Sequence, residues 1–205
     1  MLDSSVPAIV VNRLPIYLRM LGFLEREGKL ITSSQELAER LGFSSAQIRK
    51  DLSYFGEFGK QGMGYNVAYL QKQLREILRI NRTWDVVLIG AGNLGRALAN
   101  YEGFEQHGFR VIGLFDTAPK KIGTQVGPLV VQDMAELPRF LHERRLEIAM
   151  LAVPAEVAQR VANHLIELGI RAILNYAPIT LNVPENVHVY YIDPVVGLQS
   201  MTYYL

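Results

Sequence analysis

The sequence lacks cysteine altogether, which excludes disulfide bonds, thiolate metal ligands and cysteine nucleophiles. It also has no apolar run long enough to span a bilayer. The N-terminal segment MLDSSVPAIVVNR has too short an apolar stretch, and no leading basic region, to be a secretory signal. We therefore expect a soluble, cytoplasmic protein that has neither a membrane nor a metal among its partners.

Strong net charge is absent as well, because the 205 residues carry a formal charge of +1. Residues 1–84 hold 12 Lys/Arg against 8 Asp/Glu, whereas residues 85–205 hold 9 against 12. A mildly basic N-terminal part fits a DNA-binding domain in front of a regulatory domain, although a difference of this size arises readily by chance. The chain length suits one small and one medium-sized domain.

The N-terminal part shows the pattern of a helix-turn-helix. Proline favours a helix start, here at Pro7 and again at Pro15. A capping box formed by Ser33 and Glu36 begins the next helix, and Gly42 ends it in a left-handed conformation that glycine adopts at little cost. A third helix, AQIRKDLSYF, follows after a short turn, in the place of a recognition helix.

The third helix carries polar side chains on its outward face. Ala46, Ile48 and Leu52 are expected to point inward. The outward positions hold groups that contact phosphates and base edges, namely Gln47, Arg49, Lys50, Ser53 and Tyr54. A solvated amphipathic helix explains this segment equally well.

Four closely spaced glycines exclude a helix here and predict a tight β-ribbon, with Gly56 just before the segment EFGKQGMGYNV and Gly59, Gly62 and Gly64 within it. A slim glycine and lysine tip after a helix-turn-helix is typical of a wing that enters the minor groove, the alternative being a plain surface hairpin. The order of these elements favours DNA binding. An amphipathic helix from Asn66 completes a winged-helix domain of residues 1–80, and NRTWD, residues 81–85, forms a linker.

A dinucleotide-binding motif follows the linker. The apolar run Val86–Ile89 predicts a buried strand, which leads directly into GAGNLG at 90–95 and then into a helix. A second strand, VIGLF, ends in Asp116, where a carboxylate would bind the adenosine ribose and repel a 2′-phosphate. We therefore expect NAD(H) rather than NADP(H), a preference that Lys120 and Lys121 weaken.

The alternation of strands and helices continues, with strands predicted at 129–131, 148–153, 172–174 and 187–192. It predicts an α/β Rossmann domain with a parallel sheet over residues 86–192. Ligands of such sheets bind beyond the carboxyl ends of the strands. The positions expected to bind the cofactor are Gly90, Ala91, Gly92, Asn93, Leu94, Gly95, Asp116, Val153, Pro154, Asn175 and Tyr176.

The C-terminal segment IDPVVGLQSMTYYL predicts an amphipathic helix that starts near Asp193. Its apolar side chains Leu198, Met201, Tyr204 and Leu205 require cover from another surface. A partner subunit is the first expectation, and the chain's own domain is the alternative.

Together these segments resemble the Rex family of redox-sensing repressors. The resemblance rests on RLPIYLRML, SSAQIRKDLSYFGEFGKQGMGYNV, VVLIGAGNLGRALANY, FDTAPKKIG, AVPAEVAQ, ILNYAPITLNVPE and IDPVVGLQSMTYYL, nearly the whole chain. It implies a homodimer on double-stranded inverted-repeat operator DNA, with C-terminal helices, residues 193–205, swapped between subunits. It also implies that NADH is a regulatory ligand that releases the protein from DNA, while NAD⁺ competes without releasing it effectively.

By position, the resemblance implies DNA contacts at Ser45, Gln47, Arg49, Lys50, Tyr54, Lys60, Gly62, Gly64 and Tyr65. It implies a redox switch formed by Arg19, Tyr101 and, from the other subunit, Asp193. The chain departs from some members at Gln61, where they have Arg, and at Pro194, where they have an aromatic residue. The second departure puts shielding of the nicotinamide by that residue in doubt.

Two other classes of protein remain open from the residues alone. An NAD-dependent dehydrogenase with an N-terminal helical extension needs a placed proton donor, yet none of the four histidines falls clearly at a ligand-facing strand end. The Rossmann domain also leaves no residues for a substrate domain. A nucleotide-binding scaffold would leave the basic helix and the glycine ribbon without a purpose. We therefore expect a repressor and not an enzyme.

Overall fold

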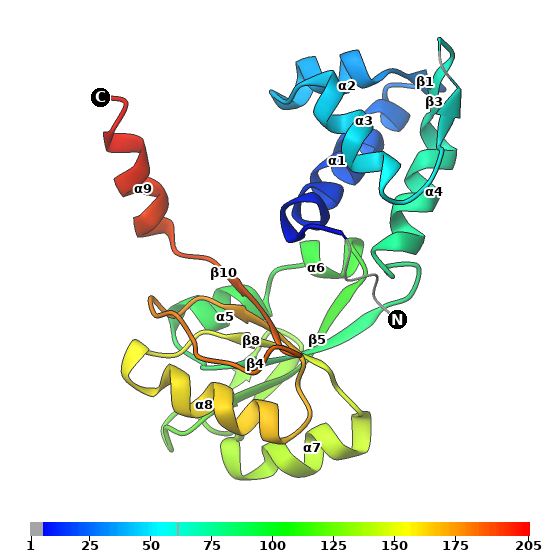
Figure 1. The fold of residues 1–205 in the computed structure, drawn as a ribbon. Helices are drawn as coiled ribbons and strands as arrows, with labels where there is room; N and C mark the ends of the chain where they lie inside the picture. Colours follow the sequence, from blue (N-terminus) through cyan, green and yellow to red (C-terminus); the bar gives the residue numbers. More distant parts are fainter. Residues whose placement is uncertain (1–5, 61) are drawn as a thin grey trace. The chain divides into compact units, whose positions relative to one another are not determined.

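A computed structural model describes residues 6–60 and 62–205, and only the backbone of Lys60. The chain separates into two compact units, Met1–Arg82 and Thr83–Leu205, which we call the N-terminal and C-terminal units (Figure 1). None of the helices in these described ranges combines the length and the apolar character that a membrane span needs.

The N-terminal unit is a winged helix, as the sequence predicts. Within the described residues its elements are α1 Ala8–Arg26, β1 Ile31–Thr32, α2 Ser34–Leu41, α3 Ser45–Ser53, β2 Gly59–Lys60, β3 Gly64–Asn66 and α4 Val67–Ile77. The strands form an antiparallel sheet in the order β1-β3-β2, with β2 and β3 as the ribbon. The helices α1 to α4 enclose one hydrophobic core.

The first helix differs from the sequence-based expectation. Pro7 is its N-cap, but α1 continues through Pro15, where a second start was expected. An interior proline lacks the N–H that the helix would use and costs one hydrogen bond. A stripe of buried side chains runs past this point and holds α1 against the core, made of Val10, Leu14, Tyr17, Leu21 and Leu24. Burial of the stripe therefore outweighs the helix-breaking tendency of the proline.

The caps of α2 and α3 follow the sequence pattern in part. The Glu36 carboxylate, expected to complete a capping box, instead accepts from the Thr32 hydroxyl at 2.9 Å and pairs with Lys29. The Ser33 hydroxyl accepts a hydrogen bond from the Glu36 N–H at 3.0 Å, and Gly42 ends α2 with φ 72°. The Ser44 hydroxyl accepts one from the Gln47 N–H at 3.1 Å, so α3 begins at Ser45. Serine oxygens in these positions satisfy N–H groups that the first turn of a helix leaves unpaired.

The C-terminal unit is a Rossmann domain. Its elements are β4 Trp84–Ile89, α5 Asn93–Ala99, α6 Gly103–Gln106, β5 Phe109–Asp116, β6 Gln125–Val126, β7 Leu129–Asp133, the 3₁₀ helix η1 Met134–Glu136, α7 Leu137–Arg144, β8 Ile148–Leu151, α8 Ala155–Glu167, β9 Ala172–Asn175, β10 His188–Tyr191 and α9 Pro194–Thr202. The strand order is β10-β9-β8-β4-β5-β7-β6, and every pairing is parallel except β6 with β7. The predicted α/β class with a parallel sheet is thereby confirmed.

Alternate residues of β4 pack into two cores on opposite faces of this sheet. Val87 and Ile89 pack with residues of α7 and α8. Val86 and Leu88 pack on the other face with Leu98 near the end of α5. Because β5 and β8 lie on either side of β4, the strand order reverses at β4. Such a switch point opens a crevice at the carboxyl ends of the strands.

Candidate functional sites

The glycine-rich loop between β4 and α5 lies at this switch point. A side chain on Gly90 would collide with the backbone of Ala152 after β8, and one on Gly95 with the carbonyl of Gly90. Both glycines are therefore required by the fold of the loop. Gly92, the N-cap of α5, has open space where a Cβ would lie. Its bare backbone is accessible to a ligand, which is what a pyrophosphate-binding loop needs.

Asp116 ends β5 beside this loop, and the residue is 8% exposed. Its Oδ2 accepts hydrogen bonds from the Ala91 N–H at 2.8 Å and from Lys121 Nζ at 2.9 Å. Its Oδ1 accepts one from the Ala118 N–H at 2.8 Å. Burial raises the pKa of this carboxyl, but the hydrogen bonds from Lys121, Ala118 and Ala91 lower it by more. An ionised carboxylate has about four acceptor sites, so one remains for a ribose hydroxyl.

Lys121 has a larger part in this site than the sequence indicates. The residues alone favour no choice between Lys120 and Lys121, whereas the structure pairs Lys121 with Asp116 and leaves Lys120 exposed. The ammonium group partly neutralises the carboxylate. It therefore reduces the repulsion that Asp116 alone would exert on a 2′-phosphate.

The remaining strand ends differ in what they offer a ligand. Val153 and Pro154 follow β8, and Tyr176 follows β9 with its phenol pKa raised by burial. Asn175 is 1% exposed, and its side-chain oxygen accepts from the Ala177 N–H at 3.0 Å. Its amide nitrogen donates to the carbonyls of Ala177 and Ile179 at 3.1 and 3.0 Å. The side chain of Asn175 thus holds the loop after β9.

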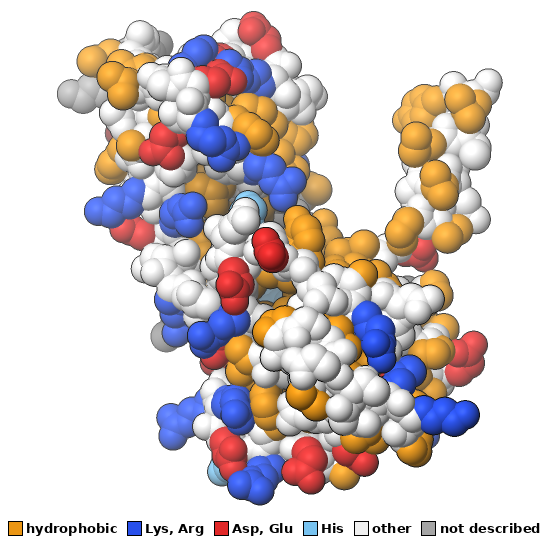
Figure 2. Space-filling view, turned by 180° about the vertical axis from the view of Figure 1, so that it is seen from behind, with side chains coloured by type: hydrophobic (Ala, Val, Ile, Leu, Met, Phe, Trp, Pro, Cys, Tyr) orange, Lys and Arg blue, Asp and Glu red, His pale blue; other side chains and the backbone are white. Residues whose placement is uncertain are grey.

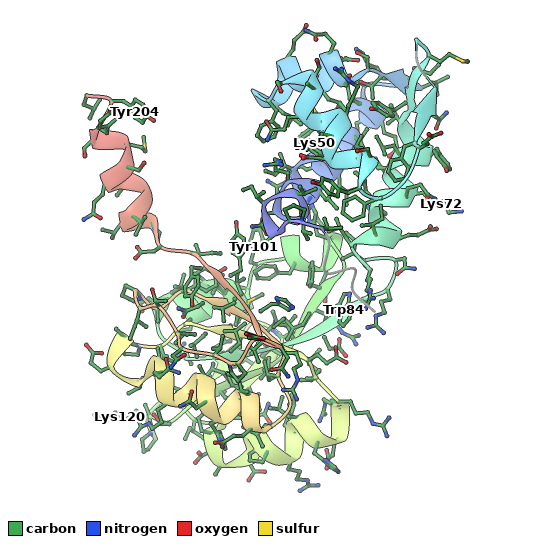
Figure 3. The ribbon with its side chains drawn as sticks, viewed as in Figure 1. Lys50, Lys72, Trp84, Tyr101, Lys120 and Tyr204 are labelled. Carbon is green, nitrogen blue, oxygen red and sulfur yellow. The ribbon has the colours of Figure 1, made fainter. Side chains whose placement is uncertain are left out.

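On α3, the predicted recognition helix, the outward face agrees with the sequence at most positions. Arg49, Lys50 and Tyr54 are exposed, and Figure 3 labels Lys50 on this helix. Gln47 and Ser45 are partly buried. Arg49 Nη1 donates to Ser34 Oγ on α2 at 3.0 Å.

One expectation for this helix is wrong. Ala46, assigned to the inward face, is exposed. The inward line is formed instead by Ile48 and Leu52, which are one turn apart and buried. Position 46 lies two residues from Ile48, which places it far around the helix from that line.

A carboxylate on α3 is buried, which the sequence alone does not reveal. Asp51 is 2% exposed, and its oxygens accept hydrogen bonds from Arg13 and Tyr17 of α1. Burial raises the pKa of Asp51, but the hydrogen bonds and the charge of Arg13 lower it by more. The pKa of Tyr17 is raised by burial and by its hydrogen bond to Asp51. The sequence shows the i, i+4 spacing of Arg13 and Tyr17, but it contains no signal that links this pair to Asp51, far along the chain.

The ribbon of β2 and β3 depends on its glycines in two ways. Gly62 and Gly64 have φ values of 81° and 72°, which favour glycine. A side chain on Gly64 would also collide with the carbonyl of Thr32 on β1. Tyr65 is partly buried against the core, which raises its pKa. Of the other ribbon positions named from the sequence, Gln61 and the Lys60 side chain lie outside the described residues.

The three residues expected to form a redox switch belong to different units. Arg19 is exposed on α1 of the N-terminal unit. In the C-terminal unit, Tyr101 is 60% exposed and its ring meets Phe104 edge to face. Asp193 is the N-cap of α9, and its Oδ1 accepts from the Val195 N–H at 2.9 Å. Among the described residues, no group of three or more His, Asp or Glu side chains is placed to hold a metal ion.

Comparisons with known proteins match both units. The family model "CoA binding domain" matches residues 81–179, and "Putative DNA-binding protein N-terminus" matches residues 5–53. The redox-sensing transcriptional repressor Rex of Chloroflexus aggregans is 57% identical over 203 residues, which cover 99% of this chain and 96% of the relative. Rex 1 of Thermotoga maritima is 48% identical, covering 98% of this chain and 96% of the relative.

Solved structures of RSP, a Rex-family repressor, match over nearly the full length. The complex of RSP with β-NAD⁺ and operator DNA has a TM-score of 0.92 at 39% identity, covering 98% of this chain and 93% of that chain. The complex of RSP with β-NADH has a TM-score of 0.88 at 37% identity, covering 98% and 94%.

The fold and its two sites define a transcriptional regulator that joins a winged helix-turn-helix to a dinucleotide-binding Rossmann unit. The chain belongs to the Rex family of redox-sensing transcriptional repressors, as its near full-length relatives establish. The expectation of a repressor rather than an enzyme is confirmed, and the dehydrogenase alternative is wrong.

Proposed function

We propose that this repressor binds inverted-repeat operator DNA as a homodimer in the cytoplasm, and that NADH releases it. The observation that carries the proposal is the full-length match to RSP in complex with β-NAD⁺ and operator DNA. Features of this chain support both halves of the proposed function. The exposed face of α3 and the glycine ribbon suit DNA, and the loop at Gly90–Gly95 with Asp116 suits the dinucleotide.

The DNA site consists of α3 in the major groove and the ribbon in the minor groove. Arg49 and Lys50 are exposed on α3 and supply charge for phosphates or guanine edges. Gln47 and Tyr54 lie on the same side of the helix as Lys50 and supply an amide and a hydroxyl. The glycines of the ribbon keep its tip narrow enough for the minor groove.

Dimer formation is supported by α9. Its described residues include none that is buried, and Figure 2 shows its hydrophobic side chains on the surface. The exposed apolar residues are Val195, Val196, Leu198 and Met201 in α9, and Tyr203, Tyr204 and Leu205 directly after it. An apolar helix of this kind requires cover, and a second copy with the same helix provides it reciprocally. A two-fold dimer also matches the two-fold symmetry of an inverted repeat.

The switch itself follows from the charge that distinguishes NAD⁺ from NADH. Nearly complete conversion between two states needs differential binding of about 5.5 kcal/mol. One charge about 4 Å from a carboxylate supplies about 4 kcal/mol at an effective dielectric of about 20, before desolvation. Two sites per dimer roughly double this effect. We assign the carboxylate to Asp193 of the other subunit. The charge on the nicotinamide then determines whether Asp193 pairs with Arg19 or with Tyr101.

Fluorescence anisotropy tests the function directly. The labelled probe is an A/T-rich inverted-repeat duplex, and NADH and NAD⁺ are added in parallel titrations, with coenzyme A as a control ligand. We expect NADH to release the DNA and equal concentrations of NAD⁺ to leave it bound. Tight DNA binding that ignores both nucleotides would contradict the switch, and no binding at any salt concentration would contradict the repressor.

The role of Asp193 is tested by Asp193→Asn in the same assay. Asparagine keeps an oxygen that can cap α9, as Asp193 does through the Val195 N–H, but removes the charge. We expect release to need about tenfold more NADH. A tenfold change corresponds to about 1.4 kcal/mol, which is part of the electrostatic energy that the Asp193 charge supplies. Release at the wild-type concentration of NADH would exclude Asp193 from the switch.

A further inference from the structure

We propose that Asp51, Arg13 and Tyr17 act together as a positioning group that fixes the rotation of α3 about its own axis. They thereby set the direction in which α3 presents its DNA-reading side chains. This inference rests on the proposed function, because it takes α3 to be the helix that reads DNA.

The carboxylate of Asp51 is bound on both oxygens by side chains of α1. Arg13 donates from Nε to Oδ2 at 2.6 Å and from Nη2 to Oδ1 at 2.7 Å. The hydroxyl of Tyr17, one turn further along α1, donates to Oδ2 at 2.6 Å. Only 3% of the Asp51 side chain and 13% of the Arg13 side chain are exposed. Two parallel bonds between a planar guanidinium and a planar carboxylate admit a narrow range of orientations.

Asp51 lies on the side of α3 that also carries predicted DNA contacts. It is four residues after Gln47, next to Lys50 and three residues before Tyr54, so these side chains turn with it. All four line a groove of about 370 Å³ between α3 and the N-terminal half of α1, with Arg13 opposite them. A small rotation of α3 at Asp51 therefore moves the tips of the reading side chains relative to α1.

The other contacts of α3 determine this rotation less strictly. Ile48 and Leu52 form one line against the core, and apolar contacts have no preferred direction. The hydrogen bond from Arg49 to Ser34 is exposed to water. A buried ion pair adds little net stability compared with apolar residues of the same size. We therefore assign the pair of Asp51 and Arg13 a role in orienting α3 and not in stabilising the fold.

The test uses Tyr17→Phe and Asp51→Asn in the full-length protein. Fluorescence anisotropy measures affinity for an A/T-rich inverted-repeat duplex and for a scrambled duplex of the same composition at the same salt concentration. Tyr17→Phe removes one hydroxyl and keeps the ring that meets Phe43 edge to face. The matched control, Glu27→Gln, disrupts the doubly bonded pair between Glu27 and Arg40, which does not involve α3.

We expect both variants to lose about tenfold in the ratio of specific to non-specific affinity, the effect of about one misplaced base contact. Binding to the scrambled duplex and to NADH should stay at the wild-type level, and Glu27→Gln should keep the wild-type ratio. Equal loss on both duplexes would indicate a merely structural role and overturn the inference. An unchanged ratio in Tyr17→Phe would also overturn it, and this variant decides the question if Asp51→Asn fails to fold. If the wild type binds both duplexes equally, it does not recognise an inverted repeat. That result would contradict the proposed function and, with it, this inference.

Discussion

Two buried carboxylates, Asp51 and Asp116, are held ionised by hydrogen bonds from neighbouring groups. Burial raises the pKa of each, but Arg13 and Tyr17 lower that of Asp51 by more, as Lys121 and two backbone N–H groups do for Asp116. Both pKa values therefore lie below the ordinary 3.8 that applies to the unfolded chain. The stability that these groups contribute is present above the unfolded pKa and is lost as the pH falls through the folded pKa.

We therefore predict that the free energy of unfolding declines below about pH 4. Urea unfolding at a series of pH values measures this decline. Asp116→Asn should show a shallower decline than the wild type, because it removes one of the carboxyls whose pKa is lowered in the folded protein. Glu185→Gln, which removes an exposed carboxylate, is the control. Parallel pH curves for Asp116→Asn and the wild type would contradict the assignment.

We propose that the pair formed by Lys121 and Asp116 influences the choice between NADH and NADPH. Removing the ammonium in Lys121→Ala leaves the carboxylate charge unbalanced next to a 2′-phosphate. We predict that preference for NADH over NADPH rises by about fivefold, the effect of a partly exposed charge pair worth about 1 kcal/mol. Titration of nucleotide fluorescence measures both affinities. Lys120→Ala should behave as the wild type, and equal changes in the two variants would contradict a specific role for Lys121.

In the glycine loop between β4 and α5, different glycines are needed for folding and for nucleotide binding. Gly95→Ala places a methyl group against the carbonyl of Gly90, so α5 must shift. Gly92→Ala meets open space, with an ordinary φ of −74°. We predict that Gly92→Ala changes stability by less than about 0.5 kcal/mol, as surface substitutions do, yet lowers NADH affinity at least tenfold.

Gly95→Ala should lower both quantities, by about 1–3 kcal/mol in stability, as overpacking does. Thermal unfolding and nucleotide titration separate the two effects. Normal NADH binding by Gly92→Ala would show that the loop does not hold the pyrophosphate.

The elements that can be predicted from the sequence are those determined by interactions between residues close together in the chain. Serine caps, glycine turns and the apolar run of β4 act over a few residues, so α2, α3 and the loop at Gly90–Gly95 follow from neighbours in the chain. Pro15 lies inside α1 because a buried stripe extends past it, which depends on what α1 packs against. From the sequence alone Asp51 is expected on the surface, because its burial depends on the packing of α1 against α3. The side chain of Asn175 is likewise explained only by the loop that it holds.

Dimerisation of the whole molecule can be tested by placing charges on the apolar surface of α9. Leu198→Asp together with Met201→Asp places two charges on the surface that the second copy should cover. We predict a monomer by sedimentation equilibrium, with NADH binding retained at the glycine loop, because a buried unpaired charge costs several kcal/mol. Gln199→Asp adds a charge to the same helix at a polar position and should leave the dimer intact. A double variant that remains dimeric would place the interface elsewhere.

The proposed switch couples a dinucleotide site to a DNA site within one protein. Coupling between two binding sites is reciprocal, so the factor by which NADH weakens operator binding must equal the factor by which operator DNA weakens NADH binding. The most direct measurement is a titration of NADH against the free repressor and against the repressor saturated with operator duplex. We expect this coupling to weaken NADH binding in the presence of operator, by the same factor that anisotropy gives for DNA release. Equal NADH affinity in both states would contradict it.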